Sequence, residues 1–175
     1  MKGSVGRWQV YGFLFTSVFG TLLHFLFDWT GGNILAAPVS AVNESIWEHM
    51  KLLFYPMLIF SLYQYRNWGR DQQNFWSIKL RGTLLGLGLI PVIYYSYTGI
   101  LGVKADWFNI TIFFLTAGFV YWWETQQFMK NRRYPSESRA IAGFLLLAAL
   151  FTVLTFRPPH IPLFQDPLTG TYGFQ

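Results

Sequence analysis

Five long apolar stretches constrain the fold of this chain more strongly than any other feature. A helix needs about 20 residues to cross the roughly 30 Å hydrocarbon core of a membrane. Stretches of about that length lie near residues 9–27, 46–65, 82–99, 107–126 and 140–156. Only 12% of the residues are charged, whereas soluble domains carry about a quarter. The sequence therefore predicts an all-α fold, a polytopic membrane helix bundle with about five transmembrane helices, in which residues 1–175 form a single integral membrane domain.

Lysine and arginine residues predict the orientation of this bundle, because short cytoplasmic loops are enriched in them. One set of loops carries ten basic residues, namely Lys2, Arg7, Arg66, Arg70, Lys79, Arg81, Lys130, Arg132, Arg133 and Arg139. The opposite set carries Lys51, Lys104 and Arg157. We therefore expect the amino terminus inside and, after five crossings, an extended carboxy-terminal segment, residues 157–175, outside.

The placement of the charges also bears on partners and ligands. The net charge is +5, but the basic residues lie in short loops between apolar runs. Membrane topology accounts for them, so the lipid bilayer is the expected partner and a nucleic acid is not. The chain has no cysteine, so any bound metal would need His, Asp or Glu ligands. Gly82 and Gly86 have the four-residue spacing of close helix packing, here expected within one chain.

The three histidines all fall at the ends of apolar stretches on the predicted outer side. His24 and Asp28 are four residues apart and therefore share one helical face. His160 belongs to the segment 157–175, whose prolines cannot continue the preceding helix. Because that segment also carries several large apolar residues, we expect it to pack back onto the bundle. It would then bring His160 and Asp166 over the polar ends of the first two helices.

The segment 43–49, with the sequence NESIWEH, is the most polar part of the outer side. Ser45 and Glu48 have the spacing of a helix capping box, in which Glu48 would return to the backbone N–H of Ser45. Asn43 is an alternative cap. Capping explains neither Glu44 nor His49. An acidic, histidine-bearing helix end in a membrane is costly unless it is paired, solvated or bound to a metal.

These polar residues predict a metal site with hydrolytic chemistry. Three imidazoles that leave one position for water are typical of catalytic zinc, which lowers the pKa of that water toward about 7. The predicted ligands are His24, His49 and His160, the candidate general bases are Glu44, Glu48 and Asp28, and the supporting residues are Asn43, Ser45 and Asp166. The expected reaction is hydrolysis of an amide or ester in a lipid-like substrate that enters from the bilayer. The spacings His-Glu-x-x-His and His-x-x-x-His are both absent.

Two other classes of function remain open. The first is a cation or proton transporter or channel component, because ionisable groups within membranes also mark ion pathways. The middle parts of the stretches 82–99, 107–126 and 140–156 carry no charged residue, which disfavours a polar path through the bundle. The second is a structural or assembly subunit, in which the polar residues only hold the tail on the bundle. The sequence does not set the oligomeric state.

Three segments carry a resemblance to a known group of proteins. They are residues 24–29, HFLFDW, residues 43–56, NESIWEHMKLLFYP, and residues 159–167, PHIPLFQDP. With them the chain resembles a family of small bacterial multi-pass integral membrane proteins, and the resemblance implies a place in the bacterial plasma membrane and no particular activity. The placement of histidine, aspartate and serine at one membrane face is also similar to the arrangement in alkaline ceramidases and adiponectin receptors. Those zinc hydrolases have seven spans and a His-x-x-x-His that this chain lacks, so the similarity is an analogy.

Overall fold

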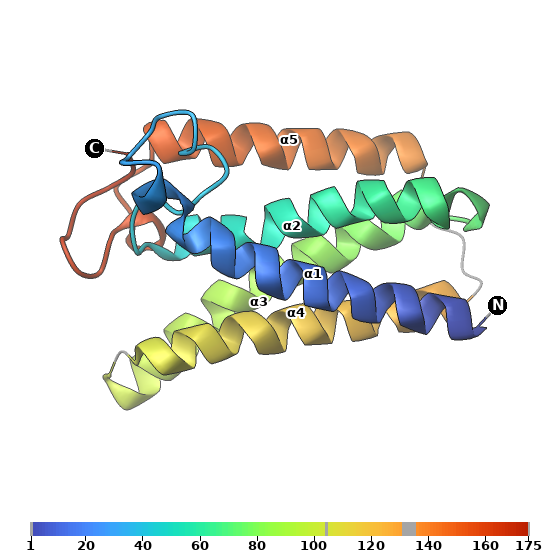
Figure 1. Ribbon diagram of the computed structural model, residues 1–175. Coiled ribbons are helices and arrows are strands. Elements are labelled where there is room, and N and C mark those ends of the chain that lie inside the picture. The colour runs from blue at the N-terminus through green and yellow to red at the C-terminus, as the bar shows by residue number, and fades with distance from the viewer. Residues whose placement is uncertain (1, 104, 131–135, 175) are drawn as a thin grey trace.

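The computed structural model describes residues 2–103, 105–130 and 136–174 of the chain. It contains five long helices, one for each apolar stretch (Figure 1). They are α1 (Lys2–Trp29), α2 (Ile46–Asn67), α3 (Phe75–Leu101), α4 (Asp106–Met129) and α5 (Glu137–Phe156), with short 3-10 turns at η1 (Gly69–Asp71) and η2 (Pro162–Phe164). Within the described ranges there is no strand, and the prediction of an all-α fold is confirmed.

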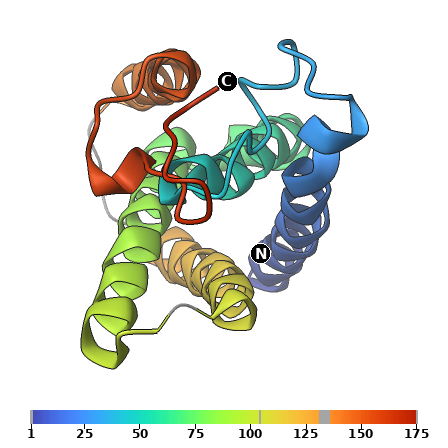
Figure 2. The same ribbon diagram turned by 90° about the vertical axis from the view of Figure 1, so that its left-hand side faces the viewer.

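Helices α1 to α4 surround a common interior, and α5 lies outside this group against α2 and α3 (Figures 1 and 2). Leu53, Phe54 and Met57 of α2 are fully buried, and Val120 of α4 is buried with them. Phe151 of α5 packs against Phe54 with a ring separation of 5.0 Å. One core therefore joins the four-helix group to α5.

Two glycines let α3 approach its neighbours closely. A methyl group on Gly86 would lie 2.7 Å from the side chain of Leu53, and one on Gly82 would lie 2.6 Å from the carboxylate of Glu124. Cβ atoms essentially never approach other atoms that closely, so a larger residue at either position would force its neighbours to shift. The prediction that this pair packs within one chain is confirmed.

Three helices have the length and apolar character needed to cross a bilayer, namely α1 over Val5–Trp29, α3 over Phe75–Leu101 and α5 over Glu137–Phe156. Their outward faces carry exposed apolar side chains such as Val18, Val92 and Leu145. Such faces suit a lipid environment. The chain therefore has the character of a membrane protein.

The start of α3 departs from the sequence prediction. The helix begins at Phe75 rather than near residue 82, and Lys79 lies inside it. Lys79 was expected in a cytoplasmic loop, yet it is fully buried and its Nζ lies 2.6 Å from Oε2 of Glu124. The same ammonium lies 4.9 Å from the ring centre of Tyr121. This pairing explains how the charge is accommodated in the interior. Lys104, Arg132 and Arg133, which entered the same charge argument, lie outside the described residues.

The carboxy-terminal segment packs back onto the bundle, as predicted. The backbone N–H of Phe174 donates to the carbonyl of Thr155 at 2.8 Å. Asn43 donates from its side-chain amide to the carbonyl of Gly173 at 3.0 Å. The ring of Phe164 lies 4.7 Å from that of Trp47 on α2. These contacts hold the segment at the end of the bundle where α2 begins (Figure 2).

Candidate metal centre

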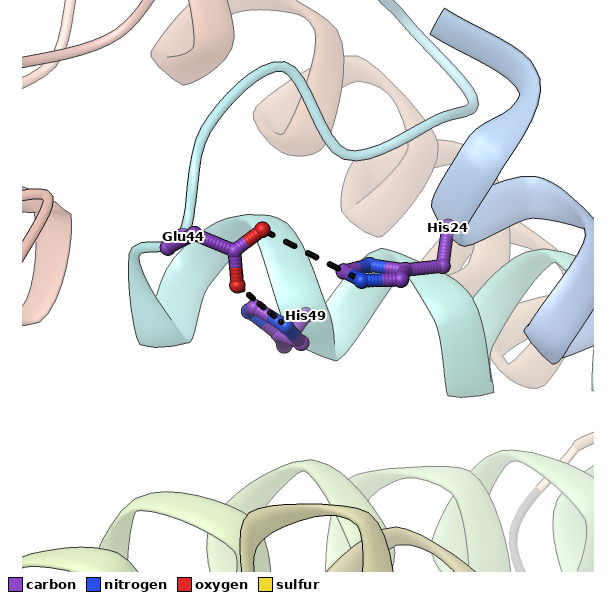
Figure 3. Close-up of side chains that lie close together, drawn as sticks. All are labelled: His24, Glu44 and His49. Atoms are coloured by element: carbon purple, nitrogen blue, oxygen red, sulfur yellow. Dashed lines mark ion pairs between the residues drawn. The ribbon is translucent and has the colours of Figure 1, made fainter. Parts of the chain in front are cut away.

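His24, Glu44 and His49 lie together at the end of the bundle that the tail covers (Figure 3). His24 comes from α1, Glu44 precedes α2, and His49 lies in the first turn of α2. Nε2 of His49 is 3.4 Å from Oε2 of Glu44, and Nε2 of His24 is 3.9 Å from Oε1 of the same carboxylate. One carboxylate therefore faces two imidazoles from different helices.

The local structure before α2 fixes the position of Glu44. Ser45 has extended backbone geometry, and its hydroxyl caps α2 by accepting from the N–H of Glu48 at 3.4 Å. Asn43 accepts from the N–H of Ser45 at 2.9 Å through its side-chain oxygen. Such a turn, in which an Asn side chain bonds to the backbone two residues on, is typical of short polar loops. Glu44 lies between these two fixed residues.

The ring of His49 is oriented by the backbone. Its Nδ1 lies 2.9 Å from the carbonyl oxygen of Ser45, which can only accept a hydrogen bond. Nδ1 therefore carries the proton, and in the neutral ring the lone pair is on Nε2, the atom that faces Glu44. Metal-binding histidines are commonly oriented by such a bond from the second ring nitrogen. His24 has its Nδ1 buried, without a hydrogen bond to any described residue.

The separations between the donor atoms are close to those of a metal site. One donor atom from each of the three residues lies within 4.8 Å of the other two. In a tetrahedral zinc site, donors about 2.0–2.2 Å from the metal are about 3.3–3.5 Å from one another. Side-chain rotations that shorten the longest separation by about 1.5 Å would complete that geometry. Two histidines with one glutamate is also a donor set found in catalytic zinc sites.

The electrostatics of the group favour an ionised carboxylate. The hydrogen bond that His49 donates from Nε2 when its ring is protonated lowers the pKa of Glu44 below its usual 4.5, and the positive charges that His49 and His24 can carry lower it further. Partial burial of Glu44 opposes this effect but does not cancel it. An ionised carboxylate is the form that binds a metal ion.

A cavity of about 500 Å³ adjoins the three side chains. Residues from all four inner helices and from the tail line it. They include Gly20 and Phe25 of α1, Leu52 of α2, Ile90 and Tyr94 of α3, Ile110, Ile112 and Phe113 of α4, and Pro167 and Leu168 of the tail. Most of this lining is apolar, and His24, Glu44 and His49 supply its polar part together with Asn109 and Thr21.

The tail does not bring His160 to the other two imidazoles, contrary to expectation. His160 is exposed, and its ring packs 4.7 Å from that of Tyr172 within the tail itself. Asp166 is buried, but it accepts from the N–H of Leu168 at 2.8 Å and from the hydroxyl of Thr169 at 2.9 Å. Asp166 therefore stabilises a turn of the tail. Both His160 and Asp166 make their contacts within the tail and not with the donor group.

Glu48 serves a different purpose from the one expected of it. Its carboxylate does not return to the N–H of Ser45 and instead pairs with Lys51 at 2.5 Å. Lys51 also donates to the carbonyl of Ala37 at 2.8 Å, and the hydroxyl of Thr155 donates to Glu48 at 3.0 Å. Both charged residues are buried. The capping prediction is therefore right for Ser45 and wrong for the carboxylate of Glu48, because a buried lysine competes for it.

Asp28 is exposed and lies one helical turn beyond His24, outside the group of three. The buried pair of Lys79 and Glu124 was missed by sequence reasoning, although Glu124 is the one acidic residue in the stretch 107–126. That isolated acid was the available signal, because an intramembrane charge requires a partner. Gln9 of α1 approaches the same pair, with its Oε1 3.5 Å from Nζ of Lys79.

Comparison with known proteins places the chain in a family without assigning an activity. No curated protein and no solved structure matches it. A family of unknown function, DUF6512, matches residues 2–174, which is almost the full length of the chain. The match agrees with the resemblance to a family of unassigned activity and gives no support to the analogy with ceramidases. The chain belongs to the DUF6512 family.

Proposed function

We propose that His24, Glu44 and His49 bind a zinc ion at the outer end of the bundle. The observation that carries this proposal is the convergence of three donor groups within 4.8 Å of one another. Three protein ligands leave the fourth position of tetrahedral zinc for a water molecule, as in catalytic zinc sites. The adjoining cavity gives a second molecule access to that position.

The chemistry proposed for this centre is hydrolysis of an ester or amide in a lipid-like substrate. Zinc held by His24, Glu44 and His49 would lower the pKa of a bound water and so supply a hydroxide for attack on the carbonyl carbon of the substrate. The proton lost by that water would pass to a carboxylate and then to the alcohol or amine that is released when its bond to the carbonyl carbon breaks. Asp28 is the proposed proton acceptor, because Glu44 serves as a ligand and Glu48 is held by Lys51. Asn43 and Ser45 support the site by fixing the loop that carries Glu44.

Metal analysis of the purified protein tests the first step. We expect about one zinc ion per chain, as three convergent ligands imply, and we expect its loss in His24→Ala and in His49→Ala. His160→Ala is the matched control, because this histidine lies at the same end of the bundle but outside the group. Metal content that is equal in all three variants would contradict the proposal.

The structural alternative predicts a different result. If the polar residues only hold the tail and helices together, the purified protein contains no stoichiometric metal, and added zinc leaves its unfolding temperature unchanged. A bound ligand stabilises the folded state by an amount that grows with the logarithm of its concentration relative to its dissociation constant. A rise in unfolding temperature with zinc in the wild type, absent in His49→Ala, therefore supports the metal centre.

The buried pair of Lys79 and Glu124 favours a second candidate, transport of a proton or another cation. Both side chains are fully buried between α3 and α4, and Glu124 has one carboxylate oxygen without a hydrogen bond to the described residues. Dye-reported proton flux into liposomes tests this candidate. Flux that is abolished in Glu124→Gln and retained in His24→Ala would favour transport, and an absence of flux in the wild type would remove it.

The proposed setting of both candidates is a bacterial plasma membrane crossed five times. Helices α2 and α4 have 22 and 24 residues, enough for a crossing, in addition to the three apolar helices. In this arrangement the amino terminus lies inside, and the metal centre and the tail lie outside.

A further inference from the structure

The cavity beside the donor group has a polar end and an apolar end. His24, Glu44 and His49 form the polar end. About one helical turn, or roughly 6 Å, deeper into the bundle, the walls are formed by Gly20, Leu52, Ile90, Ile112 and Phe113. The deeper part therefore offers no charged group to a ligand, and it suits hydrocarbon.

The exposed part of the lining shows where the cavity opens. Phe25 of α1 is 44% exposed, and Ile110 of α4 is 59% exposed. The lining residues from α3, Ile90 and Tyr94, are buried. At this end the ribbons of α3 and α4 diverge from those of α1 and α2 (Figure 1). The opening therefore lies on the side of α1 and α4, and the apolar residues around it face the position of lipid.

The tip of the tail borders the cavity on its outer side. Pro167 and Leu168 both contribute to the lining, and the turn that carries them is held by the hydrogen bonds of Asp166. A ligand therefore meets the apolar side chains of Pro167 and Leu168 on the water side and an apolar opening on the lipid side. This arrangement favours a ligand that arrives from the bilayer.

We infer that the cavity binds one long acyl chain that ends in a carboxyl or carbonyl group. The polar end of this ligand lies at His24, Glu44 and His49, and its chain passes between α1 and α4 into the hydrocarbon. The volume of about 500 Å³ lies within the range typical of small-molecule sites, about 300–1,000 Å³. The inference rests on the proposed function, since it names the substrate class of the same centre. A free fatty acid and the acyl group of a larger lipid share this chemistry.

Photolabelling of the purified full-length chain in lipid nanodiscs tests the inference. The probe is a palmitic acid analogue with a diazirine in its chain and a terminal alkyne. We expect labelled residues around Phe25, Ile112 and Phe113, and loss of this labelling when unlabelled palmitate is added in excess. Competition by a monoacyl ester at a lower concentration than palmitate requires would assign the site to the acyl group of a larger lipid, and the opposite order would assign it to a free fatty acid.

A pair of variants on α4 supplies the matched control. Ile110→Trp places a bulky side chain at the opening, and Leu115→Trp places the same side chain on an exposed position of the same helix that does not line the cavity. Both positions are exposed, so neither change disturbs the core. We expect loss of competed labelling in Ile110→Trp only.

Four results separate the acyl-chain site from the proposed metal centre. Labelling spread along the outer faces of α1, α3 and α5, without competition by palmitate or the ester, overturns the acyl-chain site. Equal labelling of Ile110→Trp and Leu115→Trp does the same. Zinc is measured in the same samples, so zinc without competed labelling overturns this inference alone. Competed labelling without zinc overturns the proposed function and leaves an acyl-chain binding site.

Discussion

Glu44 and Glu48 lie four residues apart, yet their carboxylates have different surroundings. The side chain of Glu44 is 43% exposed and faces Nε2 of two imidazoles, of which that of His49 can donate only when its ring is protonated. Glu48 is 1% exposed and accepts from Lys51, from Thr155 and from the backbone N–H of Val42. A buried carboxylate with three donors is structural. A partly exposed carboxylate beside two adjustable donors remains available for a ligand.

The lowered pKa of Glu44 predicts how acid affects the metal-free protein. Because its pKa in the folded state lies below the usual 4.5, the ionised form stabilises folding. This stabilisation is fully present above the usual pKa and is lost as the pH falls through the folded value. With a chelator present, we expect the wild type to unfold at a higher temperature than Glu44→Gln at pH 6. We expect this difference to shrink as the pH falls from 4.5 toward 3, and a constant difference over that range would contradict the prediction.

The cap on α2 gives a second prediction for a single residue. Ser45→Ala removes the hydroxyl that accepts from the N–H of Glu48, and loss of an N-cap costs about 1 kcal/mol. Ser136 is the matched control, because it occupies the N-cap position of α5 without a capping hydrogen bond from its side chain. Equilibrium unfolding in mixed micelles should therefore show a loss for Ser45→Ala and a smaller change for Ser136→Ala. Equal losses would mean that the cap does not stabilise α2.

Helices α3 and α4 are joined by a charged pair in addition to apolar packing. Lys79 and Glu124 meet at 2.6 Å, and Gly82 provides the space in which the carboxylate lies against α3. The apolar stretches predicted all five helices, since length and hydropathy are local properties of the chain. The inward direction of Lys79 was not predictable in the same way. It depends on residues 45 positions apart that only the packed helices bring together.

This pair predicts an asymmetric response to substitution. Lys79→Met leaves the carboxylate of Glu124 buried without a counter-ion, which costs about 3–5 kcal/mol of folding free energy. The double variant Lys79→Met/Glu124→Leu removes both charges, and it should recover most of that loss. Arg70→Met, at an exposed position of η1, is the control and should have little effect. Equilibrium unfolding of the four proteins in mixed micelles measures these differences. A double variant no more stable than Lys79→Met would show that packing, rather than the unpaired charge, sets the cost.

The bundle as a whole places all of the candidate chemistry at one end. The donor group, the cavity and the tail lie together where α1 ends and α2 begins, and the buried pair of Lys79 and Glu124 lies toward the other end, near the start of α3 (Figure 1). The sequence predicted that His24 and His49 share this end, because a single connection joins the end of the first stretch to the start of the second. It also predicted His160 beside them, whereas the group contains Glu44 instead. The path of a tail without helical periodicity depends on its own turns, such as the one held by Asp166.

Five crossings with the amino terminus inside predict which ends of the molecule are accessible from outside the cell. The chain has no native cysteine, so single cysteines report position without interference. Leu168→Cys, at the exposed tip of the tail, should react with a membrane-impermeant thiol reagent in intact bacteria. Arg70→Cys, at an exposed position of the opposite end, should react only after the membrane is opened. The physical reason is the excess of lysine and arginine on the side of Arg70, which retains those loops in the cytoplasm. The reverse pattern would place the metal centre inside, and reaction at both positions in intact cells would mean that an even number of crossings separates Arg70 from the tail.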